Sequence, residues 1–312
     1  MTDDVISVEG LRKSYGAVEA LRGIDLSIRR GGLVGILGPN GAGKTTLVET
    51  IEGLRSPTAG RVTVLGLDPA LQPREVKERI GVQLQTTMLQ TELKVLEILR
   101  IYASLYRKAR EPRDVLGAVG LSEKASARVG TLSGGQKQLL ALALALVHDP
   151  EIVLLDEPTT GLDPGARRAL HEVVRSLASE GRTVVLTTHY IEEAEIHCDR
   201  VVVVRAGRIV ADGSPLDLLK RASGMTTLWV AAGGRFDPTP LVAAGCTLAG
   251  REKDHLRLTT HDPTAAILAL GDLLRAPGVT LTDLRMRRPT LEDVYLELVG
   301  AEAREDESGG AP

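Results

Sequence analysis

Gly38-Pro39-Asn40-Gly41-Ala42-Gly43-Lys44-Thr45 is the stretch that decides how the first part of this chain folds. Two glycines separated by four residues precede a lysine and a hydroxyl residue, and the run follows an apolar strand candidate at residues 33–37. Residues 46–54 are typical of a helix, whose first unpaired N–H groups would face an anion. The pattern predicts a phosphate-binding loop between a strand and a helix, with Thr46 included in the anion site.

Within this loop the glycines permit close approach of the backbone to phosphate. Lys44 is expected to reach the β and γ phosphates of a nucleoside triphosphate, and the Thr45 hydroxyl is expected to bind Mg²⁺. A glycine-rich turn with an incidental lysine is the weaker alternative.

A second run begins with the apolar residues 152–155, which are typical of a strand buried on both faces of a parallel sheet. The strand ends in Asp156 and Glu157, whose side chains should diverge because side chains alternate along a strand. We expect Asp156 to hold the magnesium shell through water and Glu157 to polarise the attacking water. Solvated acids that cap a helix are the alternative, which the continuation at residues 158–163 makes weaker.

The third run is Leu132-Ser133-Gly134-Gly135-Gln136, here called the signature run. A serine hydroxyl and two N–H groups that open a helix over residues 136–147 would form another anion site. Since one loop already binds phosphate within the chain, we expect this site to serve the nucleotide of a partner chain in a head-to-tail pair. A bare Ser-Gly-Gly on its own would be interpreted as a helix cap.

Along the chain the signature run lies between the phosphate loop and the acidic strand. In that order the three runs resemble the ATP-binding subunits of ABC transporters, over about residues 5–215. The resemblance implies roles for four further residues. They are Tyr15 stacking on adenine, Gln85 touching Mg²⁺ and water, Asp163 in the loop that follows Glu157, and His189 contacting the γ phosphate. It implies ATP and Mg²⁺ as cofactors and in-line hydrolysis, with Glu157 as base, Lys44 neutralising charge, and His189 and Gln85 positioning.

The fold class expected from the resemblance is an α/β P-loop NTPase of the ABC type. A doubly wound core with antiparallel β and helical subdomains would occupy residues 1–219, and the helical subdomain would span about 86–147. A small α+β domain is expected at 224–300, with strands at 226–230, 255–259 and 279–284 and helices at 264–275 and 290–299. Residues 301–312 are expected to form a disordered tail.

The end of the small domain, residues 288–295, resembles ATPases from exporters of the daunorubicin-resistance type. Arg285, Arg287 and Arg288 are candidates for binding a partner or anionic lipid, with a solvated face as the alternative. A ligand-sensing role for residues 224–300 is also left open.

No run approaches the 18 to 20 or so consecutive apolar residues that span a bilayer. The expected partners are therefore a membrane-spanning permease docked near Gln85 and the helical insert after it, and a second copy of the chain or a homologous ATPase. This would place the chain at the cytoplasmic face of the membrane as part of an export system. A soluble regulatory or mechanical ABC ATPase is the alternative function.

Composition adds few constraints. Lys and Arg number 38 and Asp and Glu 41, so the net charge is −3 and nothing favours a nucleic-acid partner. Cys198 and Cys246 have no metal-binding spacing and are expected to be packing thiols.

In the helix after the signature run, Leu139 and Leu144 stand where the family often has arginine, which predicts tighter burial or an altered subdomain contact.

Overall fold

The computed structural model describes residues 3–84, 89–221, 225–233, 236–252, 254–275 and 278–296. The chain divides into two compact units, Met1–Pro215 and Leu216–Pro312. The predicted domain limits at residues 219 and 224 lie just beyond this division. The predicted tail at 301–312 lies outside the described residues.

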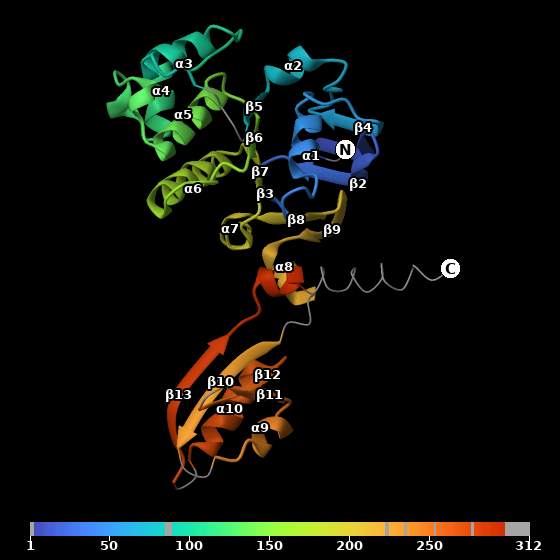
Figure 1. The fold of residues 1–312 in the computed structure, drawn as a ribbon, viewed down its shortest axis with the longest axis vertical. Helices are drawn as coiled ribbons and strands as arrows, with labels where there is room; N and C mark the ends of the chain where they lie inside the picture. The colour runs from blue at the N-terminus through green and yellow to red at the C-terminus, as the bar shows by residue number, and fades with distance from the viewer. Residues whose placement is uncertain are drawn as a thin grey trace. The chain divides into compact units, whose positions relative to one another are not determined.

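The first unit is built on a six-stranded sheet in the order β5-β6-β7-β3-β8-β9 (Figure 1). Neighbouring strands are parallel from β5 to β8, and β9 pairs antiparallel with β8. The strands are β3 (Gly32–Leu37), β5 (Ile80–Gln83), β6 (Ile152–Asp156), β7 (Thr183–Thr188), β8 (Arg200–Arg205) and β9 (Arg208–Gly213). The continuous apolar runs of β3, β6 and β7 are almost fully buried, as expected for strands covered on both faces.

A three-stranded antiparallel sheet, β2-β1-β4, accompanies this core. Its strands are β1 (Asp4–Tyr15), β2 (Val18–Arg29) and β4 (Ala59–Val64). Their apolar residues form one core cluster with α1 (Lys44–Ile51) and with alternate residues of the parallel strands, such as Ile152 and Leu154. The antiparallel sheet and α1 therefore share one face of the parallel sheet.

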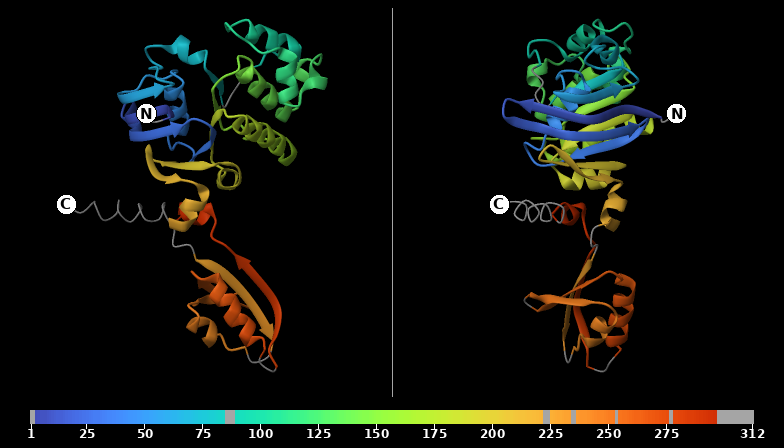
Figure 2. Two further views of the ribbon diagram at one scale, coloured as in Figure 1. Left: turned by 180° about the vertical axis from the view of Figure 1, so that it is seen from behind. Right: turned by 90° about the vertical axis from the view of Figure 1, so that its right-hand side faces the viewer.

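Helices α6 (Pro164–Ser179) and α7 (Ile191–His197) contact the parallel strands β3 and β7. Helices α3 (Val95–Ala103), α4 (Pro112–Ala118) and α5 (Gly134–Leu146) contact one another and gather at one end of the unit, where α5 also contacts β5 (Figures 1 and 2). Short helical turns are α2 (Pro73–Lys77), η1 (Ser122–Lys124) and η2 (Val129–Thr131). The predicted doubly wound core with antiparallel and helical subdomains is confirmed, although the helix expected at 46–54 ends earlier, at Ile51.

The second unit holds a four-stranded antiparallel sheet in the order β11-β12-β10-β13. Its strands are β10 (Thr226–Gly233), β11 (Thr247–Glu252), β12 (His255–Thr260) and β13 (Thr280–Arg287). Its helices are α8 (Pro215–Arg221, which begins at the division), α9 (Thr239–Ala243) and α10 (Pro263–Leu273), and residues 291–296 are also helical. Leu228, Val230 and Leu258 on one face of the sheet form a core with Leu241 and Leu270 of α9 and α10.

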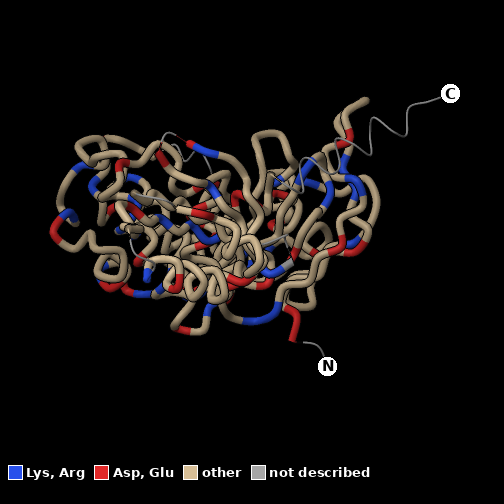
Figure 3. Tube along the Cα trace, turned by 90° about the horizontal axis from the view of Figure 1, so that it is seen from below, with Lys and Arg blue, Asp and Glu red and all other residues tan. Residues whose placement is uncertain are grey.

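Three further features concern the distribution of charge, the length of the helices and the two cysteines. Lys and Arg are interspersed with Asp and Glu along the described trace (Figure 3). Among the described helices, none is both long enough and apolar enough to cross a membrane. Cys198 and Cys246 are buried free thiols, as expected, and burial raises the pKa of Cys198 to about 12.

Candidate active site

The phosphate loop borders a cavity of about 390 Å³ at the end of β3. Its lining contains seven of the residues predicted for the nucleotide site and one that was not predicted. The lining residues are Ala20, Asn40, Gly41, Gly43, Lys44, Thr45, Thr46 and Glu157. The fold therefore brings the phosphate loop and the acidic end of β6 to one place, although 112 residues separate Thr45 from Glu157.

Glycine is required at two positions that shape this loop. Gly43 precedes α1 with φ 106°, and a Cβ there would lie 2.7 Å from the carbonyl oxygen of Ala20. A Cβ on Gly38 would collide with the Val204 carbonyl oxygen. Pro39 and Ala42 close the turn by a hydrogen bond from Ala42 N to Pro39 O at 3.2 Å, and Ala42 is buried. Gly38, Pro39 and Ala42 shape the loop without lining the cavity, whereas Gly43 does both.

Lys44 is held on the wall of the cavity with only 4% of its surface exposed. Its ammonium donates to the carbonyl oxygens of Gly38 at 2.9 Å and Pro39 at 3.1 Å, and it lies 3.2 Å from Glu157 Oε1. A buried ammonium needs such partners, since an unpaired charge away from water is strongly unfavourable. A phosphate in the cavity would meet a lysine already fixed in place.

The two acidic residues at the end of β6 are both buried and have different partners. Asp156 Oδ1 accepts a hydrogen bond from the Thr187 hydroxyl at 2.5 Å, and the same hydroxyl accepts from Glu157 N at 2.9 Å. Glu157 has φ 46°, a left-handed conformation that is unfavourable for a residue with a Cβ. The divergence expected from strand alternation is therefore reinforced by a backbone turn that sends Glu157 into the cavity.

Glu157 stands between the lysine and the predicted histidine. His189 Nδ1 lies 3.3 Å from Glu157 Oε2, and the Thr160 hydroxyl donates to the same oxygen at 3.2 Å. The His189 ring lies against Tyr190, with ring centroids 4.1 Å apart. The structure thus places Lys44, Glu157 and His189 together. Glu157 Oε1 faces Lys44, and Oε2 faces His189 and Thr160.

The donor set fits a magnesium ion that arrives with a nucleotide. Among the described residues, no three His, Cys, Asp or Glu side chains come together as a metal cluster. Mg²⁺ in nucleotide sites ordinarily takes one or two protein ligands and completes its shell with phosphates and water. Thr45 on the cavity wall and Asp156 at the end of β6, which β7 separates from β3, would supply such ligands.

The signature run does not line this cavity. Ser133 caps α5, accepting from Gln136 N at 3.3 Å, while Gln136 Oε1 accepts from Ser133 N at 3.1 Å. Gly135 packs so closely on Ala166 of α6 that no Cβ would fit, whereas Gly134 borders open space. Ser133 and Gly134 are exposed. The signature run therefore forms a helix cap, which is how a bare Ser-Gly-Gly would be interpreted. Ser133 and Gly134 remain exposed, so a ligand could reach them.

Of the three other predicted site residues, Tyr15 and Asp163 do not line the cavity. Tyr15, at the end of β1, is 41% exposed, with Lys13 Nζ 5.3 Å from its ring centroid. Asp163 caps α6 by accepting from the backbone N–H groups of Gly165 at 2.9 Å and Ala166 at 3.0 Å. Gln85 lies outside the described residues.

Sequence reasoning missed three residues that shape the site. Ala20 contributes to the cavity wall from β2, and nothing in its local sequence signals this. Thr187 bridges Asp156 and Glu157, and Thr160 bonds Glu157. The bonds of Thr187 depend on the register of β7 against β6, which the local sequence does not show.

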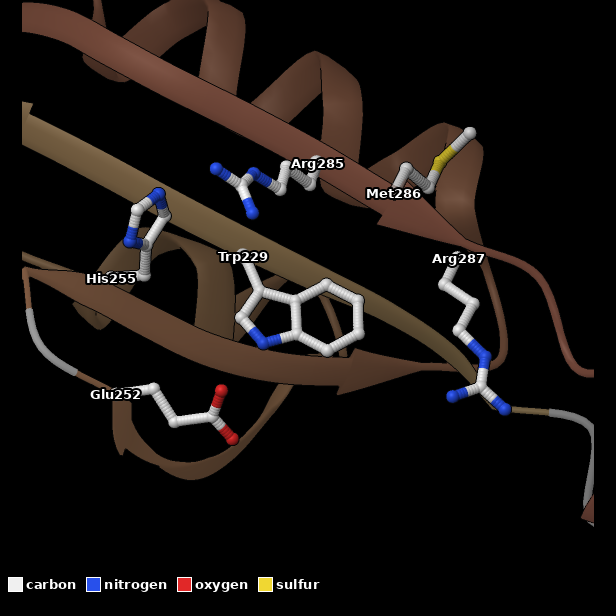
Figure 4. A pocket seen from close by; sticks show the side chains of 6 residues that line it. All are labelled: Trp229, Glu252, His255, Arg285, Met286 and Arg287. Atoms are coloured by element: carbon white, nitrogen blue, oxygen red, sulfur yellow. The ribbon is translucent and has the colours of Figure 1, made fainter.

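A larger cavity, of about 780 Å³, lies in the second unit on the sheet face opposite its core (Figure 4). Trp229 is paired across the strands with Arg285, and Glu252, His255, Met286 and Arg287 complete the lining. Arg285 pairs with Asp283 at 2.9 Å and Arg287 with Asp293 at 2.7 Å. These arginines, noted in the sequence as possible partner contacts, are each neutralised within the unit.

Comparisons with known proteins agree with this geometry. A family model described as ABC transporter matches residues 21–160. The chain is 38% identical over 304 residues to the Nod factor export ATP-binding protein I of Rhizobium johnstonii, covering 95% of each. It is also 38% identical over 316 residues to the daunorubicin resistance ATP-binding protein DrrA3 of Streptomyces coeruleorubidus, covering 99% of this chain and 100% of that protein.

Solved structures give the same result for the first unit. The structure of an ATP-binding subunit of an ABC transporter covers 70% of this chain and 93% of its own, with a TM-score of 0.64 and 29% identity. A dimeric structure of a bacterial ABC transporter cassette covers 67% of this chain and 98% of its own, with a TM-score of 0.60 and 30% identity. The comparisons do not favour the alternative of a soluble regulatory ATPase. The chain therefore belongs to the ABC transporter family, as one of its ATP-binding subunits that hydrolyse ATP.

Proposed function

We propose that this chain is the ATPase of an export system, that it acts as a pair of chains around two ATP molecules, and that it drives a separate membrane-spanning permease. The observation that carries the catalytic part is the Glu157 carboxylate, buried in the phosphate-loop cavity between Lys44 and His189. Support for export comes from relatives that match the chain over nearly its whole length and are named for Nod factor export and daunorubicin resistance.

In the proposed reaction, Glu157 accepts a proton from the water that attacks the γ phosphorus. Lys44 neutralises charge that develops on the phosphate oxygens, and His189 orients Glu157 from its other side. Tyr15 stacks on the adenine, helped by the exposed position of its ring. Thr45, Asp156 and Gln85 would hold Mg²⁺, which supplies charge neutralisation on the phosphates.

Pairing of two chains follows from the separation of the two anion sites. The phosphate loop lines its own cavity, while Ser133 and Gly134 are exposed away from it, together with the Asp163 turn. We propose that Ser133, Gly134, Gly135 and Gln136 bind the phosphates of the partner's ATP. Twofold symmetry then builds both sites from one interface. A second copy of this chain is the simplest partner, and a homologous ATPase would fit in the same way.

We propose that the permease docks in a groove of about 290 Å³ between the helical region and β5. Leu54, Ile80, Val82, Leu84, Tyr102, Tyr106, Ala141 and Leu144 contribute to its lining. Glu52, Lys77 and Ala145 complete the lining, so the groove is apolar except for one acid and one lysine. Such a groove suits a segment of a membrane protein, and one of its lining residues, Leu84, directly precedes the predicted Gln85. In this arrangement the chain lies at the cytoplasmic face of the membrane.

The test is Glu157→Gln, which keeps the shape of the side chain and removes its capacity to accept a proton. We expect ATP to bind with little change, hydrolysis to fall by at least about 100-fold, and an ATP-bound dimer to accumulate. Binding is measured by calorimetry, turnover by phosphate release, and dimer by light scattering. Glu123→Gln, an exposed carboxylate in η1, is the control and should behave as wild type. Normal turnover in Glu157→Gln would show that another group is the base.

A further inference from the structure

Glu193 is a buried carboxylate that has no role in the proposed reaction but bonds segments adjoining the catalytic residues. Glu193 is on α7 and only 7% of its surface is exposed. Its Oε2 accepts two hydrogen bonds, from the Thr159 hydroxyl at 2.9 Å and from the Thr188 hydroxyl at 3.0 Å. One oxygen atom therefore joins two segments that are 29 residues apart in the chain.

Both threonines adjoin residues of the proposed site. Thr159 follows Glu157 by two residues, and Thr188 directly precedes His189 at the end of β7. Thr188 is further fixed because its hydroxyl accepts from Tyr190 N at 2.9 Å and its carbonyl oxygen accepts from Gly38 N at 3.3 Å. Any shift of Glu193 would therefore move the segments that carry the base and the histidine relative to each other.

The other oxygen of Glu193 faces α6. Arg167 Nε and His171 Nε2 each lie 3.4 Å from Oε1, at ion-pair distance but without hydrogen-bond geometry. Arg167 also lies over the Tyr190 ring, 4.7 Å from its centroid, and His171 stacks on His197 with ring centroids 4.0 Å apart. Since α6 begins directly after Asp163, this looser contact connects Glu193 with the turn expected to meet the partner chain.

Burial of a carboxylate is costly unless it is well bonded, so this arrangement needs a compensating benefit. Burial raises the pKa of Glu193, but His171 and the two threonine hydroxyls lower it more, so that the net shift is downward and the group is ionised at neutral pH. An ionised acceptor strengthens both threonine bonds.

We infer that Glu193 is a positioning residue for ATP hydrolysis, which fixes Glu157 and His189 in register by binding Thr159 and Thr188 through one oxygen. The inference rests on the proposed catalytic roles of Glu157 and His189. Because Glu193 does not line the nucleotide cavity, its loss should affect turnover and not nucleotide affinity. Displacement of a catalytic group by about 1 Å can cost on the order of 100-fold in rate.

The experiment compares Glu193→Ala, Glu193→Gln, Thr188→Val and Thr188→Ser in the full chain. We expect Glu193→Ala to lower kcat by about 10- to 100-fold with ATP affinity within about 2-fold of wild type. Glu193→Gln retains an oxygen acceptor and should lose less, while Thr188→Ser should restore the activity that Thr188→Val loses. Glu192→Gln, the exposed neighbour on the same helix, is the matched control and should keep wild-type kcat.

A double variant separates positioning from mere stability. If Glu193 acts through Thr188, adding Thr188→Val to Glu193→Ala should lower kcat little further. A role in stability alone would lower the melting temperature and leave kcat of the folded protein unchanged, and this result would overturn the inference. If Glu193→Ala does not fold, full kcat in Thr188→Val and Thr159→Val would overturn it equally. A wild-type chain that does not hydrolyse ATP would instead overturn the proposed function, and the inference with it.

Discussion

The charged residues in the core of the first unit are buried in groups whose members satisfy one another. Lys44 and Glu157 form one pair at 3.2 Å, and Glu193 with Thr159 and Thr188 forms a second group. Removing one member of such a group leaves the other buried and unpaired, which is more damaging than loss of a surface ion pair. We therefore expect substitutions in these groups to have large effects on function.

Glu52 is an exception, because burial and the nearby acids Glu49 and Asp156 outweigh the opposing charge of Lys77. Only 2% of its surface is exposed, and its Oε1 accepts no hydrogen bond within the described structure. Burial first, and then the charges of Glu49 and Asp156, raise the pKa of Glu52 from 4.5 to about 8. The folded protein therefore holds a proton that the unfolded chain releases.

This shift gives a prediction for stability against pH. Since the folded state binds the extra proton, the free energy of unfolding should fall as pH rises from about 4.5 to about 8. Glu52→Gln imitates the protonated form and should remove that fall, so that its free energy of unfolding exceeds that of wild type by only about 1 kcal/mol at pH 5 and by on the order of 4 kcal/mol at pH 8. Urea unfolding of both proteins at the two pH values measures the difference. If the difference in the free energy of unfolding between Glu52→Gln and wild type does not change with pH, Glu52 is ionised in the folded protein.

Individual residues were predictable from sequence where the chemistry is contiguous in the chain. The phosphate loop needs glycine, lysine and a hydroxyl at fixed spacing, so Gly43, Lys44 and Thr45 could be named without a structure. The bond from Thr187 to Asp156 could not, because it depends on the register of β6 against β7, in which these two residues are partners. The contacts of Glu193 depend in the same way on three separate segments. The role of Gln85 stays a prediction.

At the scale of elements, α5 has two leucines, Leu139 and Leu144, where the family often has arginine, and Leu144 contributes to the groove beside β5. Leu144 is 4% exposed and lines the groove beside β5, while Leu139 is half-buried. Leu144 is thus buried, while the comparison with relatives that carry arginine here stays a prediction. An apolar side chain at this position adds to the groove that we propose for the permease.

Substitutions at the rim of the groove test that proposal. Leu54 and Leu84 line it and are 50% and 39% exposed, so a charge at either position should be tolerated by the fold. We expect Leu54→Glu and Leu84→Glu to keep ATP hydrolysis in the isolated chain and to reduce co-purification with the permease at least about 10-fold. Leu71→Glu, at an apolar residue 79% exposed outside the groove, is the matched control. Undiminished co-purification of both rim variants would place the permease elsewhere.

Elements were predicted best where periodicity is strong and burial complete. The strands at 33–37 and 152–155 appear as β3 and β6 with nearly the expected limits. Strand β11 and helix α9 were missed, because β11 is largely exposed and α9 has only five residues, so neither has a readable apolar period. The strands at 226–230 and 255–259 were correctly identified from alternation.

At the scale of the whole molecule, Ser133 and Gly134 are exposed and do not line the phosphate-loop cavity of their own chain, which suits the two-chain assembly that we propose. Each ATP would bind the phosphate loop of one chain and Ser133 of the other, so that nucleotide itself holds the pair together. Hydrolysis removes the bridging γ phosphate and favours separation. In our proposal a permease receives this motion, which is consistent with a relative named for Nod factor export that matches over nearly the full chain.

The most direct measurement is ATP turnover per chain as the protein is diluted, with the mass of the species followed by light scattering in the same solutions. We expect turnover per chain to follow the dimer fraction and to approach zero when the protein is monomeric. Ser133→Arg should abolish turnover at every concentration while the separate chain still binds ATP. Full turnover by a species shown to be monomeric would contradict the composite site.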